Sequence, residues 1–440
     1  MKLKTVIISL LLILISGSSF TQVVYSLNDC ISIGLEKNFS ILVARNSETI
    51  SKNNFTLGNA GYLPSVSVSS RYGGNLNTTT QNMPDGTKNI TSGAYSTSAT
   101  ASVSLGMTIF NGFSVQTNYK KLRELSQLGE LNTQLTIENY IASVVAVYYN
   151  YVQQVERYNN LVYALSLSRE RLRIDEERYL VGTFSKLQVL QSQVYLNADS
   201  SNLVKQEQIL KETQIRLNEL MASDDIGLEF ASQDTSIYLL PELPYEKLLD
   251  ETLNSNTSLL ISRKNKVISE YDYRLAVSRS YPYLDFNSGY TVTSSTSSTA
   301  SYSNQLVNGP SYGLTLGVNV FDGFNLRRQI RNSAIAIQNN EIRNSEVEQG
   351  VKADLLAVYS AYANNLGLIK LEEQNLQTAA ENLDIALEKY RLGGLSGLDL
   401  REVQKSLLDA RERLLSIRYQ AKLAEISLFQ LSGGIMTYYR

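Results

Sequence analysis

Histidine and tryptophan are missing from the 440 residues, and the chain has one cysteine and only six prolines. Without histidine, the chain can form neither a Ser-His-Asp or Cys-His catalytic system nor a histidine-ligated zinc site. A single cysteine cannot build a disulfide framework or a thiolate metal cage. The composition does not exclude an enzyme whose catalytic groups are carboxylates or lysine alone. The composition therefore disfavours catalysis without excluding it, and we expect no metal or other cofactor.

An excess of charge is also missing. The chain holds 40 Lys and Arg against 42 Asp and Glu, a formal net charge of −2. Nucleic-acid binding depends on clustered positive charge that neutralises phosphates. We therefore expect no nucleic-acid partner.

The only long apolar run lies near the N-terminus. Lys2 and Lys4 precede nearly unbroken apolar residues at 6–15, and small residues follow. This pattern is typical of a secretory signal peptide, which we place at residues 1–21. Cys30 lies well beyond the run and follows Leu-Asn-Asp, which argues against a lipid anchor, so we expect it to be a small core residue. No later stretch is apolar for about eighteen residues, so a membrane-embedded form of this chain would have to use β-strands.

The rest of the chain is one pattern written twice. Residues 109–113 (IFNGF) recur as 320–324 (VFDGF), and 177–182 (ERYLVG) recur as 388–393 (EKYRLG), both with an offset of 211. Earlier matches have an offset of 218: Asn38, Arg45 and Pro64 correspond to Asn256, Arg263 and Pro282. Self-similarity at a fixed spacing indicates a duplication. We predict a first repeat over 22–222, a linker over 223–243 and a second repeat over 244–440.

Both halves have the same predicted order of elements: helix, strand, strand, helix, helix. Apolar residues alternate with Ser, Thr, Asn and Gly around 101–109 and 314–320, which is the period of a strand. A polar loop separates the two strands of each half, and a glycine turn separates the last two helices. In the first half we predict helix at 26–62, the loop at 79–93, and helices at 113–181 and 185–221. In the second half the corresponding ranges are 244–281, 296–309, 324–391 and 396–432.

Apolar residues recur every seven positions in the last two helices of each half. In the long helices they are Val144, Tyr151, Tyr158, Leu165, Leu172 and Tyr179, and then Leu355, Tyr362, Ile369, Leu376, Leu383 and Tyr390. In the last helices they are Val189, Leu196, Leu203, Leu210 and Leu217, and then Leu400, Leu407, Leu414, Ala421 and Leu428. A sustained seven-residue repeat predicts left-handed coiled-coil packing.

The predicted strands need closure from outside the chain. Four strands leave open edges, which a bilayer does not tolerate, and four are too few to close on themselves. Several chains would therefore contribute. Aromatic residues at or near the strand ends would form the girdle of a membrane-spanning sheet: Tyr62, Tyr72, Phe110, Tyr281, Tyr283 and Phe321. The alternative is a soluble β-sandwich cap on a fibre, with these aromatics as its core.

These features resemble the TolC family of outer-membrane efflux proteins of diderm bacteria, over essentially the whole mature chain. The resemblance rests on the duplicated α-β-β-α-α order, on the two strand-to-helix motifs FNGF and FDGF, and on Tyr-x-x-Gly before the last helix. It implies a mixed α and β membrane protein. Four strands from each chain of a homotrimer would form a twelve-stranded transmembrane β-barrel, continued by a long α-helical coiled-coil barrel. The residues at the barrel-to-helix junctions would be Pro64, Phe110, Gly112, Pro282, Phe321 and Gly323.

The resemblance also implies a function and partners. Such a protein is an exit duct of a tripartite efflux pump or a type I secretion system, embedded in outer membrane lipid, with its helical tunnel in the periplasm. It docks a periplasmic adaptor protein and, through the adaptor, an inner-membrane transporter. It catalyses no reaction.

The region from Tyr390 to Glu402 resembles the family's periplasmic entrance, where a tyrosine helps to hold the aperture closed and an acidic pair lines it. Asp399 and Glu402 are three residues apart and share one helix face. Trimer symmetry would bring three copies of each to the axis, where clustered carboxylates attract cations. Ser396-x-x-Asp399 is also a helix-capping pattern, as is Ser185-x-x-Gln188, so Asp399 has a structural alternative. The two roles are compatible.

The chain departs from the family at the entrance. Leu395 stands where the best-known gate has arginine, so the tyrosine–arginine part of the latch is in doubt. Gln188 stands at the first-half equivalent of Asp399, so we expect no second acidic ring. The helix-tip turns are the candidates for adaptor docking: Gly182, Thr183, Phe184, Ser185, Gly393, Leu395 and Ser396. Ordinary turn chemistry would also explain the two glycines.

Two other classes of protein stay open. A non-conducting trimeric outer-membrane fibre or adhesin with a coiled-coil stalk would not require a duplication with two hairpins per chain. An exported enzyme with paired carboxylates would need a cleft, which heptad helices do not obviously offer. The sequence does not identify the cargo or the class of pump.

Overall fold

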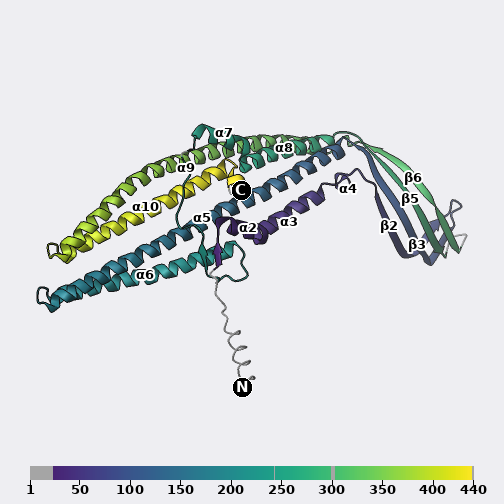
Figure 1. Cartoon of the computed structure of the whole chain (residues 1–440). Helices are drawn as coiled ribbons and strands as arrows, with labels where there is room; N and C mark the ends of the chain where they lie inside the picture. The colour runs from purple at the N-terminus through teal and green to yellow at the C-terminus, as the bar shows by residue number, and fades with distance from the viewer. Residues whose placement is uncertain (1–22, 242, 299–302, 439–440) are drawn as a thin grey trace, which may run out of the picture. The chain divides into compact units, whose positions relative to one another are not determined.

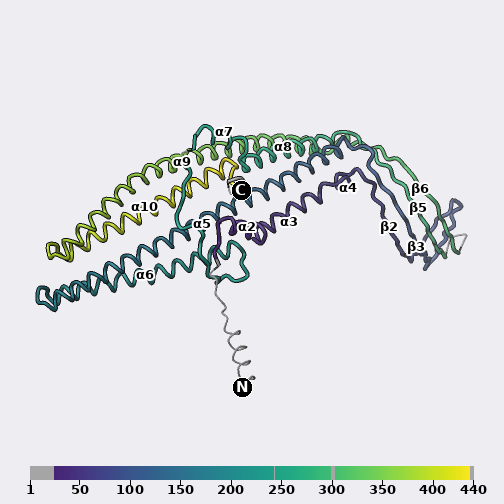
Figure 2. The backbone as a smooth tube through the Cα atoms, in the orientation of Figure 1, coloured from purple at the N-terminus to yellow at the C-terminus, as the bar shows by residue number. Residues whose placement is uncertain are grey.

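The computed structural model describes residues 23–241, 243–298 and 303–438, so the predicted signal peptide lies outside the described residues. The chain divides into two compact units, and both halves of the sequence contribute to each unit. Residues 46–132 and 258–347 form the sheet unit; the described residues of 1–45, 133–257 and 348–440 form the helical unit. Figures 1 and 2 show the elements of both.

The sheet unit holds a four-stranded antiparallel sheet in the order β2-β3-β5-β6 (Figure 1). The strands are β2 (Ser65–Asn82), β3 (Lys88–Asn111), β5 (Tyr283–Ser297) and β6 (Asn304–Gly317). Residues opposite one another in the register lie on the same side of the sheet, as Val66 and Leu105 do on one side and Ser67 and Ser104 on the other. The predicted alternation therefore gives one largely apolar face and one polar face.

The strands are longer than the sequence predicted. The predicted loop at 79–93 contracts to a tight turn in which the Met83 N–H donates to the Thr87 carbonyl oxygen at 2.8 Å. The predicted loop at 296–309 also shortens between β5 and β6. Pairing continues through polar residues because the bonds are made by the backbone, and because Thr is a good strand former. Tyr72, predicted near a strand end, consequently lies inside β2, and that prediction is wrong.

Each predicted first helix is broken at an asparagine. The pieces are α2 (Leu27–Lys37), α3 (Phe39–Asn54) and the single turn α4 (Leu57–Ala60), and then α7 (Tyr245–Ser255) and α8 (Thr257–Ser278). Asn38 follows α2 and its Nδ2 donates to the Leu220 carbonyl oxygen at 3.0 Å. Asn256 follows α7 and its Nδ2 donates to the Leu431 carbonyl oxygen at 2.9 Å. The duplication therefore preserves one side-chain-to-backbone bond at each break.

Two pairs of long helices follow the predicted ranges to within a few residues. They are α5 (Ser114–Leu180), α6 (Lys186–Leu220), α9 (Asn325–Arg391) and α10 (Gly397–Leu431). In Figures 1 and 2, α5 with α6 and α9 with α10 form two helical hairpins. The heptad residues of α9 and α10 are all buried except Leu376, which is half-buried, whereas those of α6 are half-buried except Leu217. Among the described residues, no helix combines the length and apolar character needed to cross a membrane.

The main apolar cluster of the helical unit joins α2, α5 and the linker. Cys30 is fully buried in it beside Tyr140, as expected for a small core residue. Burial raises the pKa of the Cys30 thiol to about 12, and this holds the thiol protonated and unreactive.

The linker is held by both halves of the chain. Its strand β4 (Phe230–Ser232) pairs in parallel with β1 (Val23–Tyr25), and a final turn α11 (Ile435–Tyr438) follows α10. The Tyr151 hydroxyl donates to the Phe230 carbonyl oxygen at 2.8 Å, and the Tyr362 hydroxyl donates to the Leu240 carbonyl oxygen at 2.8 Å. The two tyrosines are equivalent in the repeat, so each long helix fixes the linker by the same hydroxyl.

Candidate functional site at the hairpin tips

Each hairpin turns at a glycine in the left-handed region of backbone space. The φ of Gly182 is 77° and that of Gly393 is 83°, a conformation that L side chains rarely adopt. The Thr183 hydroxyl donates to the Arg178 carbonyl oxygen at 3.0 Å, which closes the first turn. The Gly394 N–H donates to the Lys389 carbonyl oxygen at 2.8 Å in the second. Turn chemistry therefore accounts for both glycines.

The helices after the turns begin with side-chain caps. The Asp399 N–H donates to the Ser396 hydroxyl at 3.1 Å, and that hydroxyl donates to Asp399 Oδ2 at 2.7 Å. The Ser185 N–H donates to Gln188 Oε1 at 2.9 Å at the start of α6. Ser396 therefore caps α10, and the Asp399 carboxylate accepts from the hydroxyl of that cap.

Tyr390 lies in the last turn of α9 and is fully buried. Its hydroxyl donates to the carboxylate of Asp175 on α5, and the Ser192 hydroxyl of α6 donates to the same carboxylate. Burial, followed by the hydrogen bond to Asp175, raises the pKa of Tyr390 above its ordinary value. Tyr390 therefore stays a protonated donor and joins the α9–α10 hairpin to the α5–α6 hairpin.

Arg178 completes the contact around Tyr390. Its guanidinium lies over the Tyr390 ring at 4.9 Å and over the Phe184 ring at 4.8 Å, and its Nη2 donates to the Tyr390 carbonyl oxygen. Leu395, at the position where the family's best-known gate has arginine, packs half-buried in an apolar cluster with Tyr390 and Leu400. An arginine thus contacts the tyrosine in this chain, but it comes from α5.

The two predicted acidic residues are placed differently from Tyr390. Asp399 and Glu402 lie in the first turns of α10 and are exposed. Gly397, at the start of the same helix, lies against the tyrosine, since a Cβ placed on it would be 3.5 Å from the Tyr390 hydroxyl oxygen. The tip therefore combines a buried tyrosine contact with an exposed acidic pair.

A groove with a volume of about 380 Å³ lies between the two tips. Phe184, Leu187 and Leu398 supply apolar surface, and Leu187 and Leu398 are 74% and 70% exposed. Ser396 also lines it, and Tyr390 lies at its wall. Of the predicted docking residues, Phe184 and Ser396 thus share one groove.

The predicted junction residues surround the ends of the strands. Pro64 and Pro282 immediately precede β2 and β5. Gly112 has a φ of 57°, and a Cβ there would lie 2.1 Å from the Ser278 carbonyl oxygen, so only glycine fits. Phe110 stacks edge-on with Phe113, with ring centroids 5.2 Å apart.

The second junction repeats this arrangement. Gly323 has a φ of 69°, and Phe321 stacks edge-on with Phe324 at 5.3 Å between ring centroids. The duplicated motif therefore produces the same strand-to-helix turn twice.

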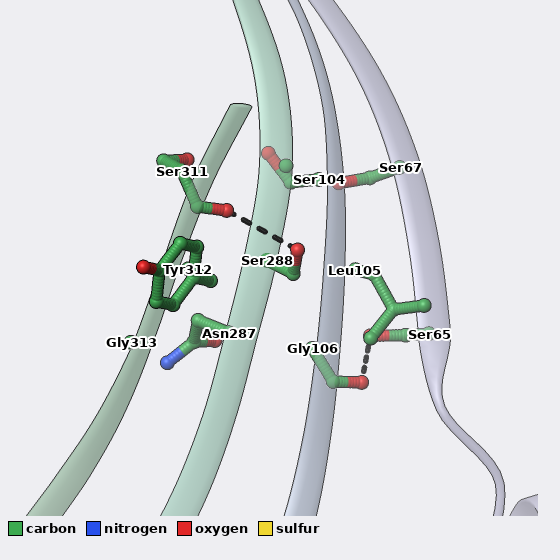
Figure 3. Close-up of a pocket in the computed structure, with 11 residues that line it drawn as sticks. Ser65, Ser67, Ser104, Leu105, Gly106, Asn287, Ser288, Ser311, Tyr312 and Gly313 are labelled. Carbon is green, nitrogen blue, oxygen red and sulfur yellow. Dashed lines mark hydrogen bonds between the residues drawn. The ribbon is translucent and has the colours of Figure 1, made fainter. Parts of the chain in front are cut away.

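A hollow of about 520 Å³ lies on the sheet (Figure 3), and its lining includes polar-face residues such as Ser104 and also Ser288 and Tyr312, which the register places on the apolar face. Small side chains from all four strands line it, including Ser67, Ser104 and Ser311. Two hydrogen bonds cross between strands here, from the Ser65 hydroxyl to the Gly106 carbonyl oxygen and from the Ser288 hydroxyl to the Ser311 carbonyl oxygen. The residues drawn in Figure 3 offer hydroxyl and amide groups but no charge.

Three residues around Tyr390 were not predicted: its partners Asp175 and Arg178, and Ser192, which donates to Asp175. One signal was available, because α6 has a second heptad made of polar residues. Ser192, Asp199, Gln206 and Thr213 recur every seven positions, and all four are buried. A polar residue repeated at the period of the core predicts a buried hydrogen-bond partner.

Comparison with known proteins places the chain in a family. The family model described as "Outer membrane efflux protein" matches residues 30–223 and 248–434. The chain is 23% identical over 334 residues to the pyoverdine export outer membrane protein OpmQ of Pseudomonas aeruginosa, a match that covers 72% of this chain and 66% of OpmQ.

Solved structures share the fold. A membrane protein from Pseudomonas aeruginosa superposes with a TM-score of 0.78 at 14% identity, over 95% of this chain and 94% of that chain. The CmeC outer membrane channel of Campylobacter jejuni superposes with a TM-score of 0.76 at 16% identity, over 93% and 86%. The resemblance predicted from the sequence is confirmed, and the chain belongs to the TolC-like outer membrane efflux protein family.

Proposed function

We propose that this chain is one subunit of a trimeric outer-membrane exit duct in a tripartite efflux or type I secretion system. The duct is passive, and its periplasmic end is gated. The observation that carries this proposal is the buried contact of Tyr390 with Asp175 and Arg178, which fastens one hairpin tip to the other. A non-conducting fibre has no need of such a contact, and membership in the outer membrane efflux protein family argues against that alternative.

The sheet supports assembly from several chains. Strands β2 and β6 each pair on one side only, so the described sheet ends in two open edges. Three copies would join these edges into a twelve-stranded barrel in outer membrane lipid, and the apolar face of the sheet would contact that lipid. The helices of the three copies would form the periplasmic tunnel.

The gate has two parts. Tyr390 with Asp175 and Arg178, called the tyrosine latch below, holds the hairpins together. Asp399 and Glu402 are exposed on α10, and three copies of each would form an acidic lining at the entrance. Negative charge in a narrow opening favours cations over anions.

The groove between the tips is the proposed docking site for the periplasmic adaptor. Exposed Leu187 and Leu398, with Phe184, would receive an apolar surface of a helical adaptor, which in turn engages the inner-membrane transporter. Because Tyr390 lines the same groove, an adaptor seated there would act on the tyrosine latch directly.

Planar-bilayer conductance of the purified protein tests the duct and the acidic lining. Wild type is compared with Asp399→Ala plus Glu402→Ala, and the matched control is Asp354→Ala plus Asp409→Ala, two exposed acids further from the turn. We expect cation selectivity to fall in the first variant and to stay unchanged in the control. No channel in any protein would overturn the duct. A channel with unchanged selectivity in the first variant would overturn the acidic lining alone.

The tyrosine latch is tested by Tyr390→Phe. Loss of one hydrogen bond to a charged group should raise the open fraction about tenfold. Tyr179→Phe is the matched control, because Tyr179 is the repeat equivalent of Tyr390 and is exposed. An open fraction equal to wild type in Tyr390→Phe would show that the contact does not gate the duct.

A further inference from the structure

Helices α5 and α6 face each other through three matched pairs of polar residues. Asp175 meets Ser192 in the tyrosine latch. Further from the turn, Ser168 on α5 donates to the carboxylate of Asp199 on α6. Between these pairs, the Arg171 guanidinium lies over the Tyr195 ring at 4.8 Å. The second and third pairs have no part in the latch described above.

Both of these pairs are also contacted from α10. Arg401 donates from Nη1 and Nη2 to the two carboxylate oxygens of Asp199, each at 2.8 Å. The Arg401 guanidinium lies over the Tyr195 ring at 5.2 Å, so this ring meets two arginines. Gln404, one turn further along α10, accepts from Arg171 Nη1 at 3.5 Å. We call Arg171, Asp199 and Arg401 the charge layer.

The charge layer is largely buried, with the side chain of Arg401 21% exposed at its edge. Arg171 is 1% exposed and Asp199 is 5% exposed. Within the described residues, Arg171 Nε and Nη2 have no hydrogen-bond partner. Burial and then the neighbouring Arg401 lower the pKa of Arg171, whereas the carboxylates of Asp175 and Asp199 oppose this. A buried pair that loses one partner is strongly destabilised, because the other charge stays buried and uncompensated.

The layer and the latch hold different helices of the same hairpin. The tyrosine latch holds α9 through Tyr390, whereas the charge layer holds α10 through Arg401. Breaking the tyrosine contact leaves the bidentate pair intact. Leu395 offers no charged group at the turn, and Arg401, the first arginine of α10, makes a bidentate pair with the other hairpin. The Arg391–Glu170 pair also joins the hairpins, at 3.8 Å and partly exposed.

We propose that the Asp199–Arg401 pair is a second lock on the entrance, so that the duct opens only when both the tyrosine latch and the charge layer release. Arg401 and Asp199 are positioning residues that hold the hairpin and do not line the cargo path. This inference rests on the proposed function, since it assumes that separation of the hairpins opens the duct.

Conductance of purified protein in planar bilayers tests the second lock. Arg401→Met keeps the aliphatic stem and removes the charge, and Arg401→Lys keeps the charge but loses the bidentate geometry. We expect Arg401→Met to raise the open fraction about tenfold, Arg401→Lys to lie between it and wild type, and Tyr390→Phe plus Arg401→Met to exceed both single variants. Arg173→Met is the matched control, because Arg173 is an exposed α5 arginine paired only with Glu170 and Glu177 in the described contacts.

A second readout does not depend on conduction. Hydrogen exchange of backbone amides at the start of α10 should become faster in Arg401→Met and remain as in wild type in Arg173→Met. Should Arg401→Met fail to fold, Asp199→Asn removes the same charge pair while keeping the shape of the side chain, and the same results are expected.

The outcomes separate this inference from the proposed function. If Tyr390→Phe raises the open fraction and adding Arg401→Met raises it no further, the second lock is overturned and the gated duct is not. No conduction by any protein, with faster exchange in α10 of Arg401→Met, would overturn the duct while supporting the contact between hairpins. Unchanged exchange in both Arg401→Met and Asp199→Asn would overturn the lock on its own.

Discussion

The two helical hairpins arose from one repeated pattern, yet they bury different chemistry. In α6 the buried heptad is Ser192, Asp199, Gln206 and Thr213. The equivalent positions of α10, 211 residues later, are Val403, Ala410, Ile417 and Ala424. Both sets use the same spacing on helices of the same length. The coiled-coil period therefore fixes which positions face inward, but not whether these positions are apolar.

The difference suggests a division of labour between the hairpins. Leu400, Leu407 and Leu414 of α10 are buried and supply apolar area, which is stabilising but not directional. Asp199 and Gln206 of α6 make specific bonds, which fix register and can be broken one at a time. The proposed gate needs contacts that release at defined points, and the polar residues of α6 are suited to this.

The largest expected effect comes from placing a buried polar residue of α6 at the equivalent apolar position of α10. Ala410 is 1% exposed and is the repeat equivalent of Asp199. Ala410→Asp would bury a carboxylate without the arginine and serine that Asp199 has, and should lower the free energy of unfolding by several kcal/mol, as for an unpaired buried ion. Thermal unfolding followed by helical circular dichroism measures this. The control is Ser406→Asp, an exposed position on the same helix, which should change little. Equal stability of the two variants would show that the α10 seam tolerates charge.

A smaller effect is expected from shortening one residue of each seam. Leu407 is 1% exposed and packs in the apolar cluster with Leu383 and Tyr390. Leu407→Ala should cost about 3 kcal/mol through lost transfer energy and a cavity. Gln206 is 3% exposed and donates to Gln154 Oε1 at 2.8 Å, and Gln206→Ala should cost about 1 to 2 kcal/mol. Denaturant unfolding ranks the two, and a larger loss in Gln206→Ala would reverse the assignment of roles.

Local periodicity explains what the sequence predicted well. The long helices, the alternating strands and the two glycine turns depend on residues close together in the chain, so spacing alone placed them. The breaks at Asn38 and Asn256 were not predicted, because apolar residues keep helical spacing across each asparagine. The strands β2 and β3 are longer than predicted, because backbone pairing continues through polar residues that break the alternating pattern.

Contacts between distant segments could not be predicted in the same way. Tyr390 was identified as a candidate from its motif, but its partner Asp175 is 215 residues away. A single sequence contains the inward period of each helix and no register between helices. The acidic pair Asp399 and Glu402 stands out in the sequence because its members are three residues apart on one helix. Asp199 and Arg401 lie on two separate helices, so no local pattern marks them as a pair.

The breaks at the two asparagines are where the halves should behave alike. Asn38 Oδ1 also accepts from the Ser40 N–H at 3.0 Å and so caps α3, in addition to the bond that Asn38 makes to Leu220. Asn38→Ala and Asn256→Ala should each lower the free energy of unfolding by about 1 to 2 kcal/mol. Asn375→Ala, at an exposed helical position, is the control and should stay within about 0.5 kcal/mol of wild type. Markedly unequal losses in the two asparagine variants would mean that the equivalent bonds have diverged in strength.

The smallest expected effect is a pH dependence of stability caused by one buried glutamate that the second half lacks. Glu138 is buried and accepts from the Thr257 hydroxyl at 2.7 Å, whereas its repeat equivalent is Gln349. Burial raises the pKa of Glu138, and its hydrogen bonds only partly oppose this. The folded state therefore holds the Glu138 proton more tightly than the unfolded state does. The contribution of Glu138 to stability is fully present below the ordinary glutamate pKa and is lost as pH rises through the raised pKa. Glu138→Gln should remove this loss, while the exposed control Glu346→Gln should retain it. Urea midpoints measured between about pH 4 and about pH 8 give the slope, and parallel curves for wild type and Glu138→Gln would show that the buried glutamate does not titrate on unfolding.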